Sequence, residues 1–205
     1  DSPDALIALG ITSGSSRTKT QGSYKVDEIY IETNVPIVND VVGIKMLSVD
    51  GAFRYSDYNT FGDTTNYKLG LKYMPTDDVI VRASSSTAFR APTIPELFQG
   101  SSDNSPTVVD PCSTNPSAFC LADGVPAAGF EPIGDQLSST LGGNPNLTPE
   151  EADTLTLGIV YSPSYVEGLS VTLDYWDTQI TNAITTVGEK LILDKCSETG
   201  QYCNQ

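Results

Sequence analysis

The chain has 205 residues, of which 39% are hydrophobic, enough for one domain with an ordinary core. Its 26 acidic residues outnumber 11 basic ones, and the net charge of −15 argues against binding to the phosphate backbone of a nucleic acid. The chain contains no histidine, the commonest neutral-pH acid–base group and metal ligand, and no apolar run approaches the roughly 20 residues of a transmembrane helix. Membrane residence would therefore have to come from strands.

Alternation of apolar and polar residues with a period of two is the dominant pattern in the chain. The alternating segments cover residues 28–35, 47–56, 66–73, 79–86, 154–161 and 169–175. This pattern is typical of antiparallel strands that have one apolar and one wet face. It predicts an all-β fold, an antiparallel meander of about six or seven strands.

The predicted connections between these strands alternate in length. Short breaks are expected at residues 36–40, 75–78 and 162–168, a longer turn at 59–65, and a very long connection at 91–151. Transmembrane barrels keep short turns on the periplasmic side and long loops outside. The spacing therefore favours a barrel wall, with residues 91–151 as a long extracellular loop.

The two faces of the predicted strands also differ in a way that suits a membrane. Charges are nearly absent from the apolar rows, where an outward Lys or Arg at mid-bilayer would cost about 2–4 kcal/mol. Aromatic residues cap these rows as they do at a lipid–water boundary, namely Tyr55, Tyr58, Tyr73, Tyr161, Tyr175 and Trp176. The polar face carries Glu28, Glu32, Asp50, Arg54, Lys68, Lys72, Arg82 and Asp174. These residues would line a water-filled lumen in a barrel, or form the solvated face of a soluble protein.

The long connection is far above the usual length of about 4–6 residues, which marks it as functional or disordered. Asp103, Asp110 and Asp123 are our candidate ligand-binding residues within it. The carboxylates left for catalysis are Asp103, Asp110, Asp123, Glu131 and Asp135. Their spacing matches no calcium-binding loop, and we predict neither a metal site nor an enzyme.

The four cysteines form two close pairs, Cys112 with Cys120 and Cys196 with Cys203. Neither pair has metal-ligand partners or the spacing of a redox site. A local disulfide in such polar, turn-rich sequence would pin a loop and contribute about 2–3 kcal/mol, whereas free buried thiols are the alternative. The pairs favour an oxidising compartment, and residues 187–193 are expected to form a short helix or turn before the second pair.

Five segments, in order, resemble stretches of the TonB-dependent receptors, the gated outer-membrane barrels of Gram-negative bacteria. They are KVDEIYIETNVPIVND (25–40), GAFRYSDYNTFG (51–62), FRAPTIPELF (89–98), NPNLTPEEADTLTLG (144–158) and DYWDTQITNAI (174–184). The resemblance implies that residues 1–205 are a single fragment from the C-terminal half of a transmembrane β-barrel of about 22 strands with long extracellular loops. The family's plug domain is expected to be absent from this chain.

The FRAPTIPELF motif has a physical interpretation beside the resemblance. Pro92 and Pro95 cannot continue a hydrogen-bond ladder, so the chain is expected to leave the wall after Arg90 as an extended stretch. Glu96, or an acidic residue of the lumen, would pair with Arg90 and fix the root of the loop.

The NPNLTPEE motif, which begins at Asn144 and Pro145, has a similar interpretation. Thr148 before Pro149 and Glu150 predicts an N-cap with proline at the first helical position, a single turn that would aim the returning strand. For both motifs, shaping the base of the loop is favoured over direct contact with a ligand.

The resemblance implies an outer-membrane active transporter that takes up siderophore–metal complexes, cobalamin or oligosaccharides. The implied partners are TonB, acting through the plug domain, outer-membrane lipid and a small nutrient ligand, with no cofactor and no nucleic acid. A passive porin-like channel and a soluble β-sandwich binding module are the alternatives. The isolated piece would have two open sheet edges, and we expect it to self-associate.

Overall fold

The computed structural model describes residues 2–12, 14–132, 134 and 136–204 and forms two compact units. The sheet unit comprises residues Ser23–Ile94 and Pro145–Ile184. The loop unit comprises Asp1–Gly22, Pro95–Asn144 and Thr185–Gln205.

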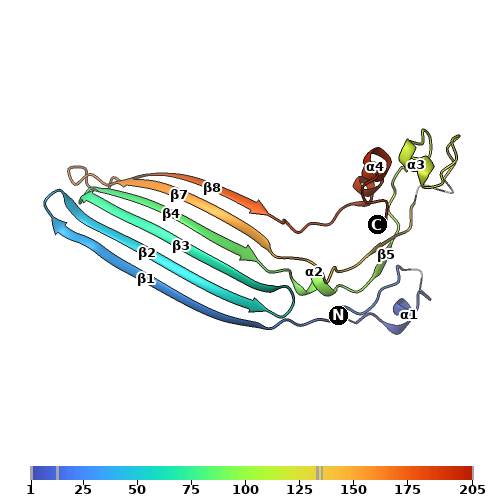
Figure 1. Cartoon of the computed structure of the whole chain (residues 1–205), viewed down its shortest axis with the longest axis horizontal. Coiled ribbons are helices and arrows are strands. Elements are labelled where there is room, and N and C mark those ends of the chain that lie inside the picture. The colour runs from blue at the N-terminus through green and yellow to red at the C-terminus, as the bar shows by residue number, and fades with distance from the viewer. Residues whose placement is uncertain (1, 13, 133, 135, 205) are drawn as a thin grey trace. The chain divides into compact units, whose positions relative to one another are not determined.

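The sheet unit is one six-stranded antiparallel sheet in the order β1-β2-β3-β4-β7-β8 (Figure 1). Its strands are β1 (Val26–Val41), β2 (Ile44–Tyr58), β3 (Gly62–Thr76), β4 (Val79–Arg90), β7 (Glu150–Tyr161) and β8 (Val171–Thr181). Every strand pairs with the strands that precede and follow it in this unit, so the predicted all-β antiparallel meander is confirmed. The sheet is open at β1 and at β8.

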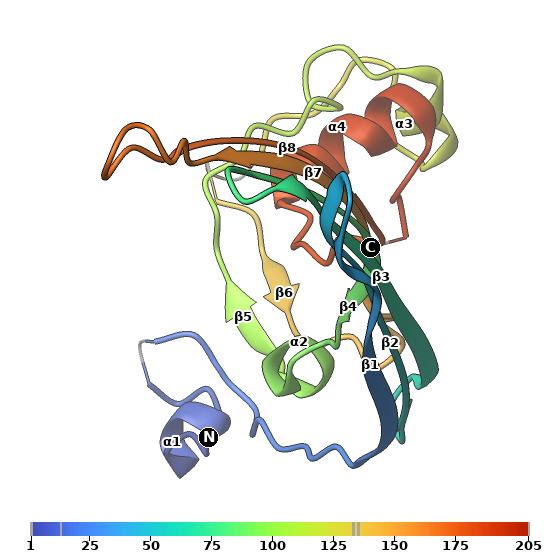
Figure 2. The same cartoon turned by 90° about the vertical axis from the view of Figure 1, so that its left-hand side faces the viewer.

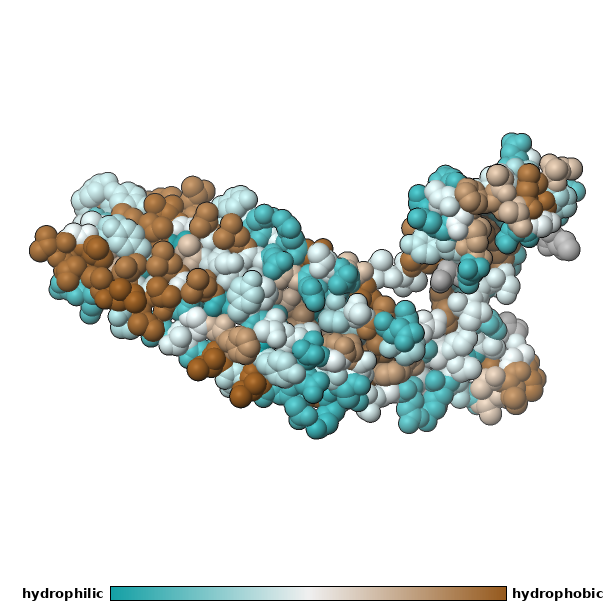
Figure 3. All heavy atoms as spheres, in the orientation of Figure 1, coloured by the Kyte–Doolittle hydropathy of each residue, from teal (hydrophilic) through white to brown (hydrophobic). Residues whose placement is uncertain are grey.

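The strand register aligns the apolar residues into continuous rows. One row crosses all six strands through Val35, Val49, Leu71, Ala83, Leu157 and Tyr175. Four of its members are exposed, namely Val35, Leu71, Leu157 by 47% and Tyr175 by 57%. Figure 3 shows hydrophobic residues gathered over the end of the sheet that carries the short turns. In the described part of the chain, the buried hydrophobic residues are Leu97 and Cys120, neither of which is in a strand of this sheet. The apolar face thus has no protein core beneath it.

The first short connection lies further along the chain than predicted. Strand β1 continues through residues 36–40, where a break was expected, and turns at Val42 and Gly43, whose φ is +85°. A register shift between Pro36 and Val38 accommodates the proline. Proline in sheets is confined to edge strands and bulges, and Pro36 lies in an edge strand of this sheet beside a register shift.

Two other predicted turns are shorter in the structure. The turn expected at 59–65 closes within residues 59–61, and the one expected at 75–78 closes at Asp77 and Asp78. Pro75 lies inside β3, where the register with β4 shifts between Tyr73 and Thr76. Local turn residues therefore did not outweigh the hydrogen bonds gained by extending the strands.

Two aromatic residues do not belong to the apolar rows with which they were grouped. Trp176 lies opposite Thr156, on the polar face, while its neighbour Tyr175 lies in an apolar row. Tyr58 is the last residue of β2, in register with Gly62, and its ring stacks on Phe61 at 4.6 Å between centroids. Strict alternation decides the face, whatever the aromatic character of the side chain.

The loop unit contains short elements, so the long connection is less irregular than predicted. The elements are α1 (Ala5–Ala8), α2 (Ile94–Phe98, which starts one residue before this unit), β5 (Ser102–Asn104), α3 (Ala118–Ala122), β6 (Ser139–Leu141) and α4 (Glu189–Thr199). Strands β5 and β6 pair in an antiparallel fashion, and α3 lies against α4 (Figure 2).

Helix α4 confirms the helix expected near residues 187–193, although it extends further, to Thr199. It ends at Gly200, whose φ of +70° is the left-handed conformation that caps a helix without steric cost. No helix in the described part of the chain is long and apolar enough to cross a membrane.

Candidate functional site

An ion pair crosses three strands on the polar face of the sheet. Arg82 on β4 lies in register with Gly158 on β7, which in turn lies opposite Asp174 on β8. The Arg82 Nη2 atom lies 2.8 and 2.9 Å from the two carboxylate oxygens of Asp174, above Gly158. A Cβ atom at Gly158 would collide with both side chains, so the glycine creates the space for the ion pair.

A second ion pair, which also lies beside a glycine, joins the adjacent strands β2 and β3. Lys68 Nζ lies 3.5 Å from Asp50 Oδ2, and the Asp50 carboxylate occupies the space above Gly70. Nearby, the Arg54 guanidinium lies over the Tyr30 ring at 5.5 Å from its centroid. The charged residues predicted for one face are therefore together on that face. They form a hydrated surface of both signs, as suits the wall of a water-filled lumen.

A third ion pair closes the end of the sheet at the root of the long connection. Arg90 and Glu150 are the last pair of the β4–β7 ladder. The Arg90 Nε and Nη2 atoms lie 2.7 and 3.0 Å from the two carboxylate oxygens of Glu150, and Oε1 also accepts the Ile184 N–H at 2.7 Å. An acidic residue of the sheet thus holds Arg90, one of the two predicted arrangements. Pairing with Glu96 stays a prediction.

Helix α2 corrects the extended stretch predicted after Arg90. Strand β4 ends at Arg90 as expected, but Ile94–Phe98 is helical and includes Pro95, a residue that fits the first turn of a helix. Leu97 points inward and is only 2% exposed. The carbonyl of Glu96 accepts the Asn144 N–H at 2.8 Å. The FRAPTIPELF and NPNLTPEE motifs therefore contact each other and form the base of the loop.

The helical turn predicted at Thr148 is wrong. Pro145 and Asn146 form a turn, Thr148 and Pro149 are not helical, and β7 begins at Glu150. The backbone groups that a capped turn would have satisfied are used instead by the β4–β7 ladder. Pro149 is compatible with either outcome, because its fixed φ suits extended chain as well as helix.

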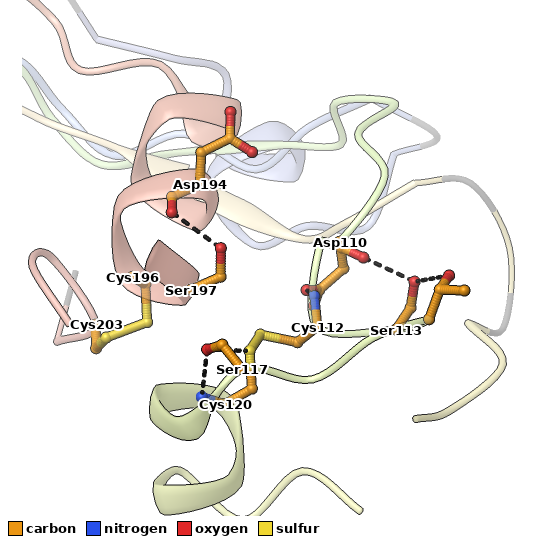
Figure 4. Close-up of a disulfide and its surroundings, with 10 residues drawn as sticks. Asp110, Cys112, Ser113, Ser117, Cys120, Asp194, Cys196, Ser197 and Cys203 are labelled. Carbon is orange, nitrogen blue, oxygen red and sulfur yellow. Dashed lines mark hydrogen bonds between the residues drawn. A yellow bond between two sulfur atoms is a disulfide. The ribbon is translucent and has the colours of Figure 1, made fainter. Parts of the chain in front are cut away.

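Both predicted disulfides are present, between Cys112 and Cys120 and between Cys196 and Cys203 (Figure 4). Cys120 lies in α3, is 1% exposed and donates its backbone N–H to the N-cap hydroxyl of Ser117 at 3.3 Å. Where α3 meets α4, the ring of Phe119 packs on Gly200. Two covalently closed loops therefore lie against each other in this unit.

The three candidate ligand-binding carboxylates are spread through the loop unit, and two of them accept hydrogen bonds from other residues of this unit. Asp103 Oδ2 accepts the Ser16 hydroxyl at 2.7 Å, and Asp110 Oδ1 accepts the Cys112 N–H at 2.8 Å. Asp123 is the C-cap of α3. Asp135 lies outside the described residues. Among the described residues, no group of three or more acidic, cysteine or histidine side chains is arranged to hold a metal ion. Ligand binding by Asp103, Asp110 and Asp123 remains a prediction.

Glu189 is a structural residue that the sequence reasoning missed. Its Oε1 atom accepts hydrogen bonds from Asn104 Nδ2 and Ser139 Oγ, each at 3.0 Å, and these two residues face each other across the β5–β6 pair. Hydrogen bonds from its own backbone N–H, from Ser139 and from Asn104 hold the pKa of Glu189 below its ordinary value of 4.5. The sequence signal was a glutamate at the start of a helix, where the helix dipole favours negative charge.

Taken by itself, the sheet unit has the features of a barrel-wall segment: a single layer, one exposed apolar face and one charged face. The chain belongs to the family of TonB-dependent receptor β-barrels. Residues 2–204 match the family model described as "TonB dependent receptor-like, beta-barrel". This assignment is consistent with a role other than catalysis.

Solved receptors of this kind share the fold of the chain. The siderophore receptor PirA from Acinetobacter baumannii is 18% identical, with a TM-score of 0.53 over 77% of this chain and 18% of that one. A mutant of the ferric enterobactin receptor PfeA from Pseudomonas aeruginosa is 20% identical, with a TM-score of 0.54 and the same coverage. The chain thus spans about a fifth of the length of these receptors. No curated protein sequence matches it.

Proposed function

We propose that this chain is part of the wall and loops of an outer-membrane active transporter, a TonB-dependent receptor of a Gram-negative bacterium. The observation that carries the proposal is the single sheet whose exposed apolar row crosses all six strands while ion pairs occupy the opposite face. A soluble β-sandwich would need a second sheet to cover that row. Lipid covers it in a barrel.

The proposed cargo is a siderophore–metal complex, cobalamin or an oligosaccharide. Family membership supports this range, and the similar folds of receptors named for siderophores and ferric enterobactin favour the first member of it. The proposed energy source is TonB, acting through a plug domain in the rest of the receptor. The disulfide-closed loop unit would lie on the outer side, in an oxidising environment.

Uptake in whole cells tests the proposal and its main alternative. We would measure uptake of labelled ferric siderophores, cobalamin and oligosaccharides in cells that have the complete receptor and in cells from which its gene is deleted. The same comparison would be made with and without TonB. An active receptor should give saturable uptake that disappears without TonB. Uptake that persists without TonB would instead identify a passive porin-like channel.

The isolated chain offers a second test. Strands β1 and β8 have free outer edges in this sheet, and the apolar row has no cover. We expect the isolated chain to self-associate through these surfaces. Light scattering over a range of concentrations would show it, and a strictly monomeric particle would contradict it.

A further inference from the structure

The ladder between β3 and β4 opens before either strand ends. It stops at the pair Lys68–Ser86, although β3 continues to pair with β2 as far as Gly62, and β4 continues to pair with β7 as far as Arg90. Beyond that point the Tyr67 N–H bonds to the Thr87 hydroxyl at 3.0 Å in place of a ladder carbonyl. Backbone groups on the facing edges of the two strands are therefore left for water or a ligand.

Aromatic contacts span this opening. Phe89 on β4 packs edge-on against Tyr58 and Phe61. The distances between ring centroids are 5.8 Å to Tyr58 and 6.4 Å to Phe61. Phe61 and Phe89 also line a hollow of about 430 Å³ at the opening, which we call the wall hollow. This volume lies within the range of about 300–1,000 Å³ that is usual for small-molecule sites.

Most of the other residues that line the wall hollow are polar, and the charged ones are all acidic. It includes the carboxylates of Asp63, Glu151 and Asp153 and the amides of Asn66 and Asn182, with no Lys or Arg among the described lining residues. A phosphate, carboxylate or sulfate would be repelled there. Acceptor oxygens beside ring faces suit a ligand that has many hydroxyl donors and an apolar ring face.

The position of the wall hollow along the sheet limits what reaches it. Asp63 and Asp153 lie on the same face as the apolar rows, on strands β3 and β7, but beyond the last aliphatic residues of those rows, Leu69 and Leu155. In a bilayer that level is the membrane surface. Sugars of glycolipids and dissolved sugars both have access there.

We propose that the wall hollow binds a saccharide without anionic groups. This inference goes beyond the proposed function, since it concerns a site in the wall and holds whatever cargo the receptor imports. Phe61 and Phe89 pack against the sugar ring, while Asp63, Asp153 and Asn66 accept or donate hydrogen bonds at its hydroxyls.

The test uses the complete receptor purified in detergent, with maltotriose as the probe in a calorimetric titration. Asp153→Ala should weaken binding by about tenfold or more, because a hydrogen bond to a charged acceptor is worth about 1.5–3 kcal/mol. The control is Asp177→Ala, a carboxylate on the same face of β8 that does not line the wall hollow, and it should leave binding unchanged. Thermal unfolding of both variants separates lost binding from lost folding.

A second arm separates the two sources of sugar. Receptor in phosphatidylcholine nanodiscs with and without a digalactosyl lipid would show whether the wall hollow takes the sugar of a glycolipid. Binding of either probe that depends on Asp153 supports the proposal, and the probe that binds identifies the source. Absence of binding to both, equal binding by the Asp153→Ala variant, or preference for sulfated maltotriose would overturn it.

Discussion

The two units of this chain are stabilised in different ways, although one polypeptide forms both. The sheet unit consists of strands of 11 to 16 residues joined by antiparallel ladders, and many of its large apolar side chains are exposed. The loop unit has elements of 3 to 11 residues, two disulfides and the buried residues Leu97 and Cys120. In the proposed receptor, the sheet unit would rely on lipid and on neighbouring strands, whereas the loop unit has covalent closure and a small buried core of its own.

The largest effect should come from a charge placed on the apolar face. Leu173→Arg on β8 should cost the complete receptor about 2–4 kcal/mol of folding free energy in vesicles, because arginine at mid-bilayer is poorly solvated. Thr172→Arg, one residue away on the polar face, is the matched control and should cost much less. Urea titration of vesicle-refolded protein measures both. Equal costs would mean that this face does not contact lipid.

Removal of a disulfide should affect the loop unit alone. Replacing Cys196 and Cys203 by serine should destabilise α4 by about 2–3 kcal/mol, from the loop-closure entropy of a short covalent ring. Hydrogen exchange followed by mass spectrometry should show faster exchange in α4 and the adjacent α3, with the strands of the sheet unit unchanged. Loss of protection in β7 or β8 would show that the two units are coupled.

A smaller effect is expected where Gly158 accommodates the Arg82–Asp174 ion pair. Gly158→Ala should displace the pair and cost at most about 1 kcal/mol, since both side chains are half-exposed. In an Asp174→Ala background the same change should be neutral or stabilising, because alanine restricts the unfolded chain more than glycine does. A double-mutant cycle on unfolding free energies measures the difference. If Gly158→Ala had the same effect on the unfolding free energy in both backgrounds, contact between the added methyl group and the ion pair would not affect stability.

The smallest effect should be a local dependence on pH at Glu189. Its pKa is lowered in the folded state, so the stabilisation is present above about pH 4.5 and is lost as the pH falls through the folded-state pKa. Amide protection at the start of α4 and in β5 and β6 should therefore decrease below that pH. Glu189→Gln should remove the dependence. A decrease of the same size in the variant would assign it to another group.

The alternation of side chains predicted most of the sheet because a strand's period of two is a local property. Tyr67, Leu69 and Leu71 could be placed on one face from spacing alone, and the register in the structure agrees. The disulfides could be predicted for a similar reason, since each pair is separated by only 7 or 8 residues. The motifs around Arg90 and Asn144 lie where β4 ends and shortly before β7 begins.

Contacts between distant segments decided the rest, and no local pattern encodes them. Pro36 and Pro75 signalled breaks, yet ladder hydrogen bonds carried β1 and β3 past them. Thr148 signalled a helix cap, but pairing of Glu150 with Arg90, 60 residues earlier, made the segment extended. The bonds from Glu189 to Asn104 and Ser139, and the opening between β3 and β4, likewise depend on which segments meet. Local patterns were thus enough for the faces of most strand residues, the cystine pairs and the family. The strand limits, the pairing of Arg90 with Glu150 and the wall hollow depend on contacts between distant segments.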